Sequence, residues 1–256
     1  MKQTAIKAAR EAGKILMKHY KVFSRSEVQK KSEHEIVTKV DMEANKTIIK
    51  VIKSKYKNHD FLSEETGLED NPEKYIWIID PLDGTTNYST KYPIFATSIA
   101  LAYRAKIILG ITYAPLTGEI FVAEKGKGAF VNGKRMHVSK TATLRKSIVT
   151  YGYSHKDRSY GRAIEIYSRI FEKAENVRHY GSATLELAYV AAGRTEAEYI
   201  PGKINIWDVA AGVLMVEEAG GTVTDFKGFK CEWDCRDILA SNGKIHQELL
   251  RQINKS

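Results

Sequence analysis

One stretch of this chain, residues 77–87 (WIIDPLDGTTN), limits its fold more than any other. An Ile-rich apolar run is typical of a buried strand, and the proline after it predicts the strand's end. Asp80 and Asp83 would then leave the sheet on a rigid bend, close enough to share a hard cation. The backbone N–H groups of Gly84 and Thr85 follow and would face an anion, as at helix N-termini. Carboxylates for a metal beside amides for a phosphate indicate metal-assisted phosphoryl chemistry.

The length and composition set broad limits on the class of protein. The chain has 256 residues, enough for one large domain or for two lobes that share a core, and 43% of them are hydrophobic. No apolar run is long enough to cross a bilayer. Residues 1–20 repeat Ala, Ile and Leu at helical spacing and lack the unbroken apolar stretch of a signal peptide, which predicts a cytoplasmic location.

The net charge of +9 fits an anionic substrate or a nucleic acid equally well. The lysines are spread along the whole chain, which favours a solvated lysine-rich surface over a nucleic-acid patch. The two cysteines, Cys231 and Cys235, form a single C-x3-C without a second pair or a nearby histidine. This is weak support for zinc and favours reduced thiols.

Three patterns of secondary structure follow one another along the chain. Helical spacing covers residues 3–20 and 41–57, β-rich segments separated by turns fill 76–131, and strands and helices alternate from 147 onward. The expected strands are 95–103, 107–113, 119–123, 147–153, 177–180, 195–200, 222–225 and 238–241, with a glycine-punctuated hairpin at 126–133. The later helices are expected at 160–174, 182–192, 209–219 and 244–253.

This mixture of antiparallel hairpins and interspersed helices predicts a layered α+β fold. The pattern changes near residue 140 without a linker. We therefore expect an N-terminal α+β lobe (1–140) that carries most candidate ligands and a C-terminal α/β lobe (141–256) that carries Asp208, joined in one continuous catalytic unit. Ser182 is expected to cap the helix that it begins.

Acidic residues stand at the edges of apolar elements. Glu64 and Glu65 follow residues 61–63, and Asp208 follows Trp207 at the start of a nearly all-apolar helix. Because a desolvated and unpaired carboxylate is costly, each should meet a metal, a cation or a helix N-terminus. Simpler roles stay open: an N-cap for Asp208, and an exposed loop acid for Glu64.

The remaining acids have similar alternatives. Asp41 stands at the start of the second expected helix and would serve as its N-cap, and Asp80 would form a turn or an ion pair. Taken together with Glu64, Asp83 and Asp208, they supply the oxygen ligands that Mg²⁺ requires.

The chain resembles the inositol monophosphatase family of Mg²⁺-dependent, lithium-sensitive sugar phosphatases. The most specific matches are D-P-x-D-G-T-T-N at 80–87 and W-D-x-A-A-G at 207–212. Further matches occur in the family's order across roughly residues 30–225: Glu64-Glu65, Asp41 within 36–41, Gly181-Ser182-Ala183, and 218–221. The resemblance implies an α-β-α-β-α layered sandwich of the inositol monophosphatase and fructose-1,6-bisphosphatase type, and a homodimer.

The resemblance also implies two to three Mg²⁺ ions per subunit. The implied metal ligands are Glu64, Asp80, the Leu82 carbonyl, Asp83 and Asp208. In the family, the counterpart of Asp80 bridges two metals, and the Glu64 position also touches a third, weaker one. Hydrolysis is then direct, without a phosphoenzyme, by attack of an activated water.

Other residues acquire roles from the same resemblance. Asp41 and Thr85 would form the hydrogen-bonded pair that, with Glu64, serves catalysis by orienting the attacking water. Gly84, Thr85, Ser182 and Asp208 would contact the substrate, the first two through their amides on the phosphate. Further candidates near the site are Lys30 or Lys31 beside the outer metal, Glu65 and Lys203.

The substrate is less constrained than the reaction. Family members that act on inositol place a glutamate shortly before the W-D motif, whereas this chain reads YIPGK at 199–203, and Glu196 and Glu198 are displaced. Lys203 would meet a second anionic group of a bisphosphate, or be a solvated lysine. Inositol 1-phosphate is the first expectation, with fructose 1,6-bisphosphate, histidinol phosphate and 3'-phosphoadenosine nucleotides as alternatives. Binding to RNA or the transcription machinery is the non-enzymatic alternative.

Overall fold

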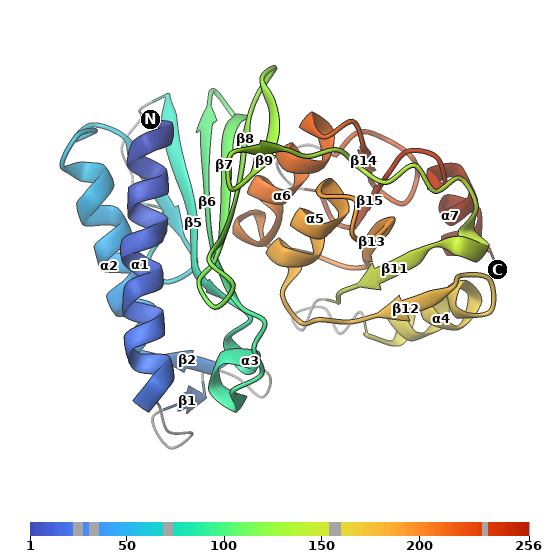
Figure 1. The fold of residues 1–256 in the computed structure, drawn as a ribbon, viewed down its shortest axis with the longest axis horizontal. Helices are drawn as coiled ribbons and strands as arrows, with labels where there is room; N and C mark the ends of the chain where they lie inside the picture. Colours follow the sequence, from blue (N-terminus) through green and yellow to red (C-terminus); the bar gives the residue numbers. More distant parts are fainter. Residues whose placement is uncertain (23–27, 31–35, 69–73, 154–159, 232–234, 256) are drawn as a thin grey trace.

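Two amphipathic helices, α1 (Lys2–Val22) and α2 (Lys39–Lys53), lie side by side at the N-terminal end of the structure (Figure 1). Buried Ala5, Ala8, Ala12 and Leu16 recur at helical spacing on α1, so one face of that helix is apolar. The computed structural model describes residues 1–22, 28–30, 36–68, 74–153, 160–231 and 235–255. The short strands β1 (Val28–Lys30) and β2 (Ile36–Thr38) pair antiparallel between the two helices in sequence.

An eight-stranded sheet follows, in the order β10-β9-β8-β7-β6-β5-β3-β4. Its neighbours pair antiparallel except for β3 and β5, which run parallel. The strands are β3 (Asp60–Ser63), β4 (Gly67–Leu68), β5 (Tyr75–Asp83), β6 (Ala96–Tyr103), β7 (Lys106–Ala114), β8 (Glu119–Glu124), β9 (Gly128–Val131) and β10 (Lys134–Arg135). The short helix α3 (Thr85–Thr90) leaves the end of β5.

Both faces of this sheet are covered by helices. Trp77 and Ile79 of β5 belong to the core shared with α1 and α2, whereas Ile78 belongs to the core on the opposite face. This alternation follows the two-residue period of a strand. Helices α5 (Ala183–Ala191) and α6 (Ile206–Glu218) cover the second face and separate it from the rest of the C-terminal region.

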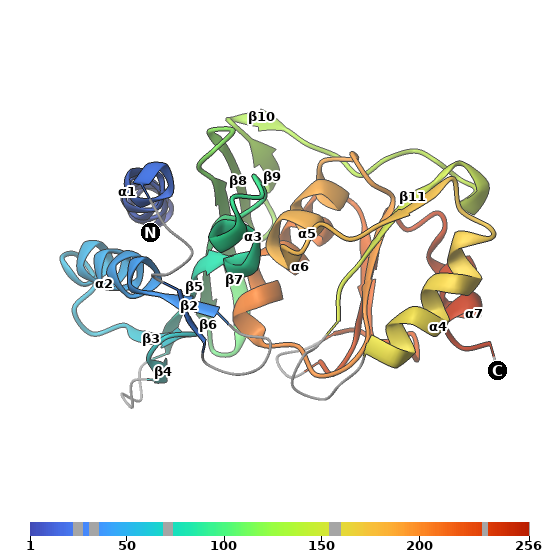
Figure 2. The same cartoon turned by 90° about the horizontal axis from the view of Figure 1, so that it is seen from below.

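A five-stranded sheet lies beyond α5 and α6, in the order β12-β11-β13-β15-β14. Its strands are β11 (Ile148–Tyr151), β12 (Asn176–Arg178), β13 (Ala197–Ile200), β14 (Thr222–Thr224) and β15 (Ile238–Ser241). The 3-10 turn η2 (Leu144–Lys146) precedes it, and α4 (Tyr160–Phe171) and α7 (His246–Ile253) cover its outer face (Figure 2). The predicted α-β-α-β-α sandwich is confirmed, while the division into lobes at residue 140 stays a prediction.

Local details differ from the sequence-based expectation. Pro81 does not end β5, because the strand continues to Asp83 through a bulge that sets Asp80 opposite Ser98 and Asp83 opposite Ala96. Two residues of β5, Pro81 and Leu82, stand opposite the single residue Thr97 of β6, which bends the strand where its carboxylates emerge. Helix α3 and strands β1 to β4 were not expected as separate elements. Asp41 lies inside the first turn of α2, not at its N-cap.

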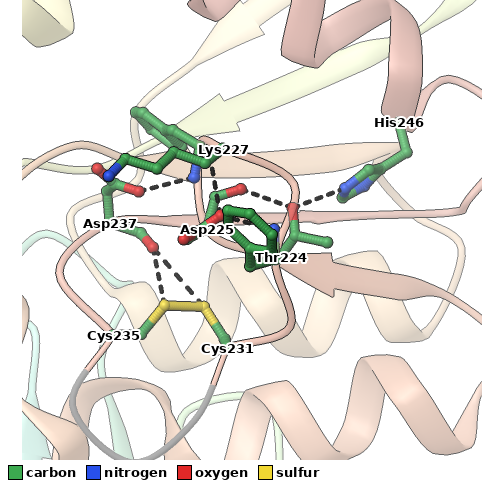
Figure 3. The surroundings of a disulfide bond; sticks show 9 residues. Thr224, Asp225, Lys227, Cys231, Cys235, Asp237 and His246 are labelled. Atoms are coloured by element: carbon green, nitrogen blue, oxygen red, sulfur yellow. Dashed lines mark hydrogen bonds between the residues drawn. A yellow bond between two sulfur atoms is a disulfide. The ribbon is translucent and has the colours of Figure 1, made fainter.

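The prediction of reduced thiols is wrong: Cys231 and Cys235 form a disulfide in this structure. Figure 3 shows the bond beside the Asp237 carbonyl, which lies 3.7 Å from the Cys231 Sγ and 3.0 Å from the Cys235 Sγ. The two Cα atoms are 5.4 Å apart, within the range that a disulfide spans. The sequence argument weighed compartment and cysteine count, and neither reports how close a folded chain brings two side chains.

Among the described residues, none of the helices combines the length and the apolar character that a membrane span requires.

We predict that Gly110→Ala destabilises the fold by separating α6 from β7. A Cβ at this position would lie 2.8 Å from the Ala211 carbonyl oxygen and 2.9 Å from the Ala211 Cα. Overpacking of this kind costs about 1–3 kcal/mol. Thermal unfolding should show a Tm lower by roughly 2–4 °C for each kcal/mol. Gly161→Ala on α4 is the control, because its Cβ would meet nothing within 4 Å. Equal Tm values for the two variants would contradict the predicted close approach.

Candidate functional site

Carboxylates from three separate elements converge at one end of the eight-stranded sheet. Asp80 and Asp83 stand on either side of the β5 bulge. Glu64 follows the parallel neighbour β3, and its backbone N–H donates to the Ile79 carbonyl at 3.2 Å. Asp208 lies in the first turn of α6. The buried Asp80 carboxylate interacts electrostatically with four others: Glu64, Asp83, Asp208 and Asp41.

Burial and mutual repulsion both act on these acids. Burial, and then repulsion from the neighbouring carboxylates, raises the pKa of Asp80 and of Asp208 well above the usual range. Burial also raises the pKa of Asp83, although hydrogen bonds from Ser182 and Thr184 offset part of the rise. The cluster therefore resists full ionisation until a cation neutralises it.

Hydrogen bonds fix the orientation of three of these carboxylates. Asp80 Oδ1 accepts from the Leu82 N–H at 3.0 Å. Asp208 Oδ2 accepts from the Asn205 N–H at 3.3 Å and from its Nδ2 at 3.1 Å. The N-cap of α6 is Asn205, so the N-cap role left open for Asp208 is wrong; Asp208 lies in the first turn as the acidic partner of a capping box and also belongs to the acidic cluster.

Asp83 receives its hydrogen bonds from α5. Its Oδ2 accepts from Ser182 Oγ at 2.5 Å, Thr184 N at 3.0 Å and Thr184 Oγ1 at 2.6 Å. Ser182 stands at the N-cap of α5, but its side chain makes no capping hydrogen bond, contrary to expectation. Its hydroxyl is directed to Asp83 instead, and Asp83 caps the helix from outside.

The turn after β5 depends on a glycine. Gly84 has φ +84°, a left-handed conformation, and a Cβ there would lie 2.9 Å from the Ile94 carbonyl oxygen. Thr85 follows as the first residue of α3, and its Oγ1 donates to the Leu82 carbonyl at 3.0 Å. That carbonyl has a second lone pair for a further partner. Asp41 is buried, and its pairing with Thr85 stays a prediction.

The donor set fits Mg²⁺. It consists of carboxylate and carbonyl oxygens, which this hard cation prefers. Among the described residues, no Lys, Arg or His forms an ion pair with Asp80, Asp83 or Asp208. Within the same residues no three His, Cys, Asp or Glu side chains already stand in a metal-ligating arrangement.

For the remaining candidate residues within the described ranges, the structure gives a position in the fold. The Glu65 N–H donates to Ser63 Oγ at 3.3 Å, so its backbone belongs to the β3 turn. Lys203 is exposed beside Gly202, which has φ +89°. Lys30 lies in β1, opposite Ile36. Lys31 lies outside the described residues, and the choice between the two lysines stays a prediction.

Sequence reasoning missed some residues that shape the site. Asn205 precedes Asp208 by three residues, a spacing typical of a capping box, and this signal was readable. Thr184 gave no local signal, because its contact with Asp83 spans 101 residues. Asn87 belongs to the quoted motif, yet its contact with the Tyr180 carbonyl at 2.7 Å depends on the tertiary structure.

Two further buried acids, Glu186 and Glu198, lie close enough to Asp83 to interact with its charge. Glu186 of α5 accepts the Tyr180 N–H at 2.6 Å and interacts with Glu198 of β13. Burial, followed by repulsion from Asp83, raises the pKa of Glu186 to about 8. Burial and the Glu186 charge raise the pKa of Glu198 well above its usual range. At least one of the two carboxyls therefore holds a proton at neutral pH.

Comparison with known proteins gives the family. The chain matches the family model described as "Inositol monophosphatase family" over residues 1–256. The chain belongs to the inositol monophosphatase family. Members of this family are generally Mg²⁺-dependent, in agreement with the donor set. The resemblance drawn from the motifs is thereby confirmed.

Among curated relatives, Nus factor SuhB of Escherichia coli (strain K12) is 38% identical over 255 residues, covering 99% of this chain and 95% of the relative. Among solved structures, extragenic suppressor protein suhB from Bartonella henselae matches with a TM-score of 0.94 and 35% identity, covering 99% and 98% of the two chains. Thermotoga maritima IMPase TM1415 matches with a TM-score of 0.90 and 35% identity, covering 98% and 95%.

We predict that the metal-free protein loses stability as pH rises between about 5 and 8. An acid with a raised pKa keeps a proton in the fold that the unfolded chain releases, so stability falls from the unfolded pKa up to the folded one. For Glu186 this window runs from 4.5 to about 8. Ionisation of Glu186 lowers the free energy of unfolding by at most about 1.4 kcal/mol per pH unit within this window. Thermal unfolding in EDTA at several pH values measures the slope.

Substitution assigns the slope to a residue. Glu186→Gln keeps an acceptor for the Tyr180 N–H but cannot ionise, so it should flatten the decrease in Tm. Glu165→Gln is the control, because that side chain is 70% exposed on α4. A Glu186→Gln protein with the wild-type slope would show that this carboxyl does not carry the effect.

Proposed function

We propose that this protein is a Mg²⁺-dependent phosphoric monoester hydrolase that acts on small sugar or polyol monophosphates. The observation that carries the proposal is the convergence of Glu64, Asp80, Asp83 and Asp208 beside the left-handed Gly84 turn. Family membership supports the same reaction class. Two or three ions per subunit are part of the proposal.

The proposed roles are those that the family resemblance implies, and the clustering of the carboxylates supports them. Glu64, Asp80, Asp83, Asp208 and the Leu82 carbonyl would hold Mg²⁺. When bound, the metal would neutralise phosphoryl charge and make a nearby water more acidic. Positioning and charge neutralisation would supply most of the acceleration, because phosphoryl transfer asks little covalent chemistry of a protein.

The turn and its neighbours would handle the substrate and the water. The N–H groups of Gly84 and Thr85 would hold the phosphate, with Ser182 and Asp208 on the substrate side. Asp41 is buried and would orient the attacking water together with Thr85. The hydroxyl of Thr85 donates to the Leu82 carbonyl, which fixes its side chain within the turn.

Inositol 1-phosphate is the proposed substrate, and fructose 1,6-bisphosphate, histidinol phosphate and 3'-phosphoadenosine 5'-phosphate are the alternatives. Lys203 is exposed in a segment without a carboxylate from 199 to 203. A role for Lys203 in binding would favour the alternatives that carry a second anionic group, fructose 1,6-bisphosphate and 3'-phosphoadenosine 5'-phosphate. Phosphate release from these four compounds, with Mg²⁺ and with added Li⁺, gives kcat/KM for each. Absence of hydrolysis of all four would contradict the proposed sugar-phosphatase activity.

Binding to RNA or the transcription machinery is a second candidate. It is favoured by the relative named Nus factor SuhB and by the net charge of +9. Filter binding of RNA across a salt series tests it, because phosphate contacts give a steep fall of affinity with salt. Weak binding that does not change with salt would contradict this candidate.

We also propose a homodimer and a cytoplasmic location. Light scattering on the purified protein measures the mass directly. The Cys231–Cys235 disulfide is unusual for a cytoplasmic protein, because disulfides are rare in reducing compartments.

We predict that Asp83→Asn lowers kcat by about a hundredfold or more, because a lost metal ligand is worth several kcal/mol at the transition state. The amide keeps the size of the side chain, so circular dichroism should match the wild type. Asp225→Asn is the control; its carboxylate accepts the Lys227 and Phe229 N–H groups at the end of β14. An Asp83→Asn enzyme with wild-type kcat in saturating Mg²⁺ would overturn the assignment.

A further inference from the structure

The Asp83 carboxylate is held by residues that the sequence motifs do not connect with it. Three donors converge on its Oδ2, and two of them, the N–H and the hydroxyl, come from Thr184. Thr184 is completely buried in the first turn of α5. The acid and its donors come from different layers of the sandwich, because Asp83 ends β5 of the eight-stranded sheet.

The start of α5 is itself held from two sides. Asn87, in α3 just after the metal-ligand segment, donates from Nδ2 to the Ile94 carbonyl at 2.8 Å and to the Tyr180 carbonyl at 2.7 Å. Glu186, one turn further along α5, accepts the Tyr180 N–H at 2.6 Å. The backbone of Tyr180, just before Ser182, is thus fixed by the side chain of Asn87 from α3 and by that of Glu186 from α5.

This arrangement has a consequence for the acidic cluster. Repulsion from the other carboxylates pushes the Asp83 side chain away, and α5 offers N–H and O–H donors that hold one oxygen in place. Three donors on Oδ2 restrict rotation of the carboxylate and so fix the direction of both of its oxygens. Outer hydrogen-bond partners of this kind set the orientation of a metal ligand and its affinity for the ion.

We propose that Thr184 is a positioning residue for Mg²⁺ binding, acting through Asp83, and that Asn87 supports it by fixing the start of α5. This inference rests on the proposed Mg²⁺-dependent function for its effect on catalysis. The effect of Thr184 on Mg²⁺ affinity does not depend on which substrate the protein takes.

Calorimetric titration of Mg²⁺ into the full-length protein tests the proposal without substrate. Thr184→Val removes the hydroxyl and keeps the shape, and should weaken the Mg²⁺ Kd by about 10–100-fold. Thr184→Ser restores a hydroxyl at the same place and should recover most of the affinity. Thr150→Val is the matched control, because its buried hydroxyl donates to the Ala197 carbonyl and not to Asp83.

A second readout separates positioning from stability. The Tm of each protein is measured in EDTA and again in Mg²⁺, because at a given concentration a ligand that binds more tightly stabilises the fold more. We expect Thr184→Val to lose the Mg²⁺-induced rise in Tm and Thr150→Val to keep it. If Thr184→Val does not fold, Ser182→Ala, which deletes one Asp83 donor, should weaken the Mg²⁺ Kd instead.

The outcomes distinguish this inference from the proposed function. A wild-type Mg²⁺ Kd in both Thr184→Val and Ser182→Ala, or an equal loss in Thr150→Val, would overturn the positioning role. A protein that binds Mg²⁺ in a Thr184-dependent way but hydrolyses none of the four phosphate esters would support the inference and contradict the proposed function. With activity present, Thr184→Val should need more Mg²⁺ for half-maximal rate while kcat at saturation changes less.

Discussion

Repulsion between clustered carboxylates is the interaction on which the arrangement of the site depends. Asp80, Asp83 and Asp208 are drawn into a region where burial alone raises their pKa values, and their charges act on one another. A fold tolerates such a cluster only if hydrogen bonds orient the acids and a cation compensates them. The surrounding elements can be understood as the means of holding these side chains close together.

Helix α6 is fixed at both ends, which places Asp208. At its start Asn205 donates twice to the Asp208 carboxylate. At its end both oxygens of Glu218 accept N–H groups of the β8–β9 turn, from Gly126 and Gly128, at 2.7 Å each. Between them the helix approaches β7 closely at Gly110. The helix therefore joins the eight-stranded sheet to the acidic cluster.

The N-termini of two helices, α5 and α6, donate N–H groups to acids of this site. Asp208 accepts the N-cap N–H of α6 and belongs to the cluster, while Asp83 accepts an N–H group in the first turn of α5 from a distant strand. The positive end of a helix dipole stabilises a carboxylate, so both acids gain from these positions. A residue that looks like a simple cap in the sequence can therefore be a functional residue as well, because one carboxylate has two oxygens.

The sequence by itself determined the layered fold class, the family and the acids of the cluster, because those depend on periodicity and on short motifs such as 80–87. It misjudged Pro81, since a bulge lets a strand continue past a proline, and it misjudged the cysteines, since pairing depends on distance in space. Only the tertiary structure decided the partners of Asp83: a hydrogen bond between residues 101 apart leaves no periodic trace, and packing of the two sheets around α5 and α6 creates it.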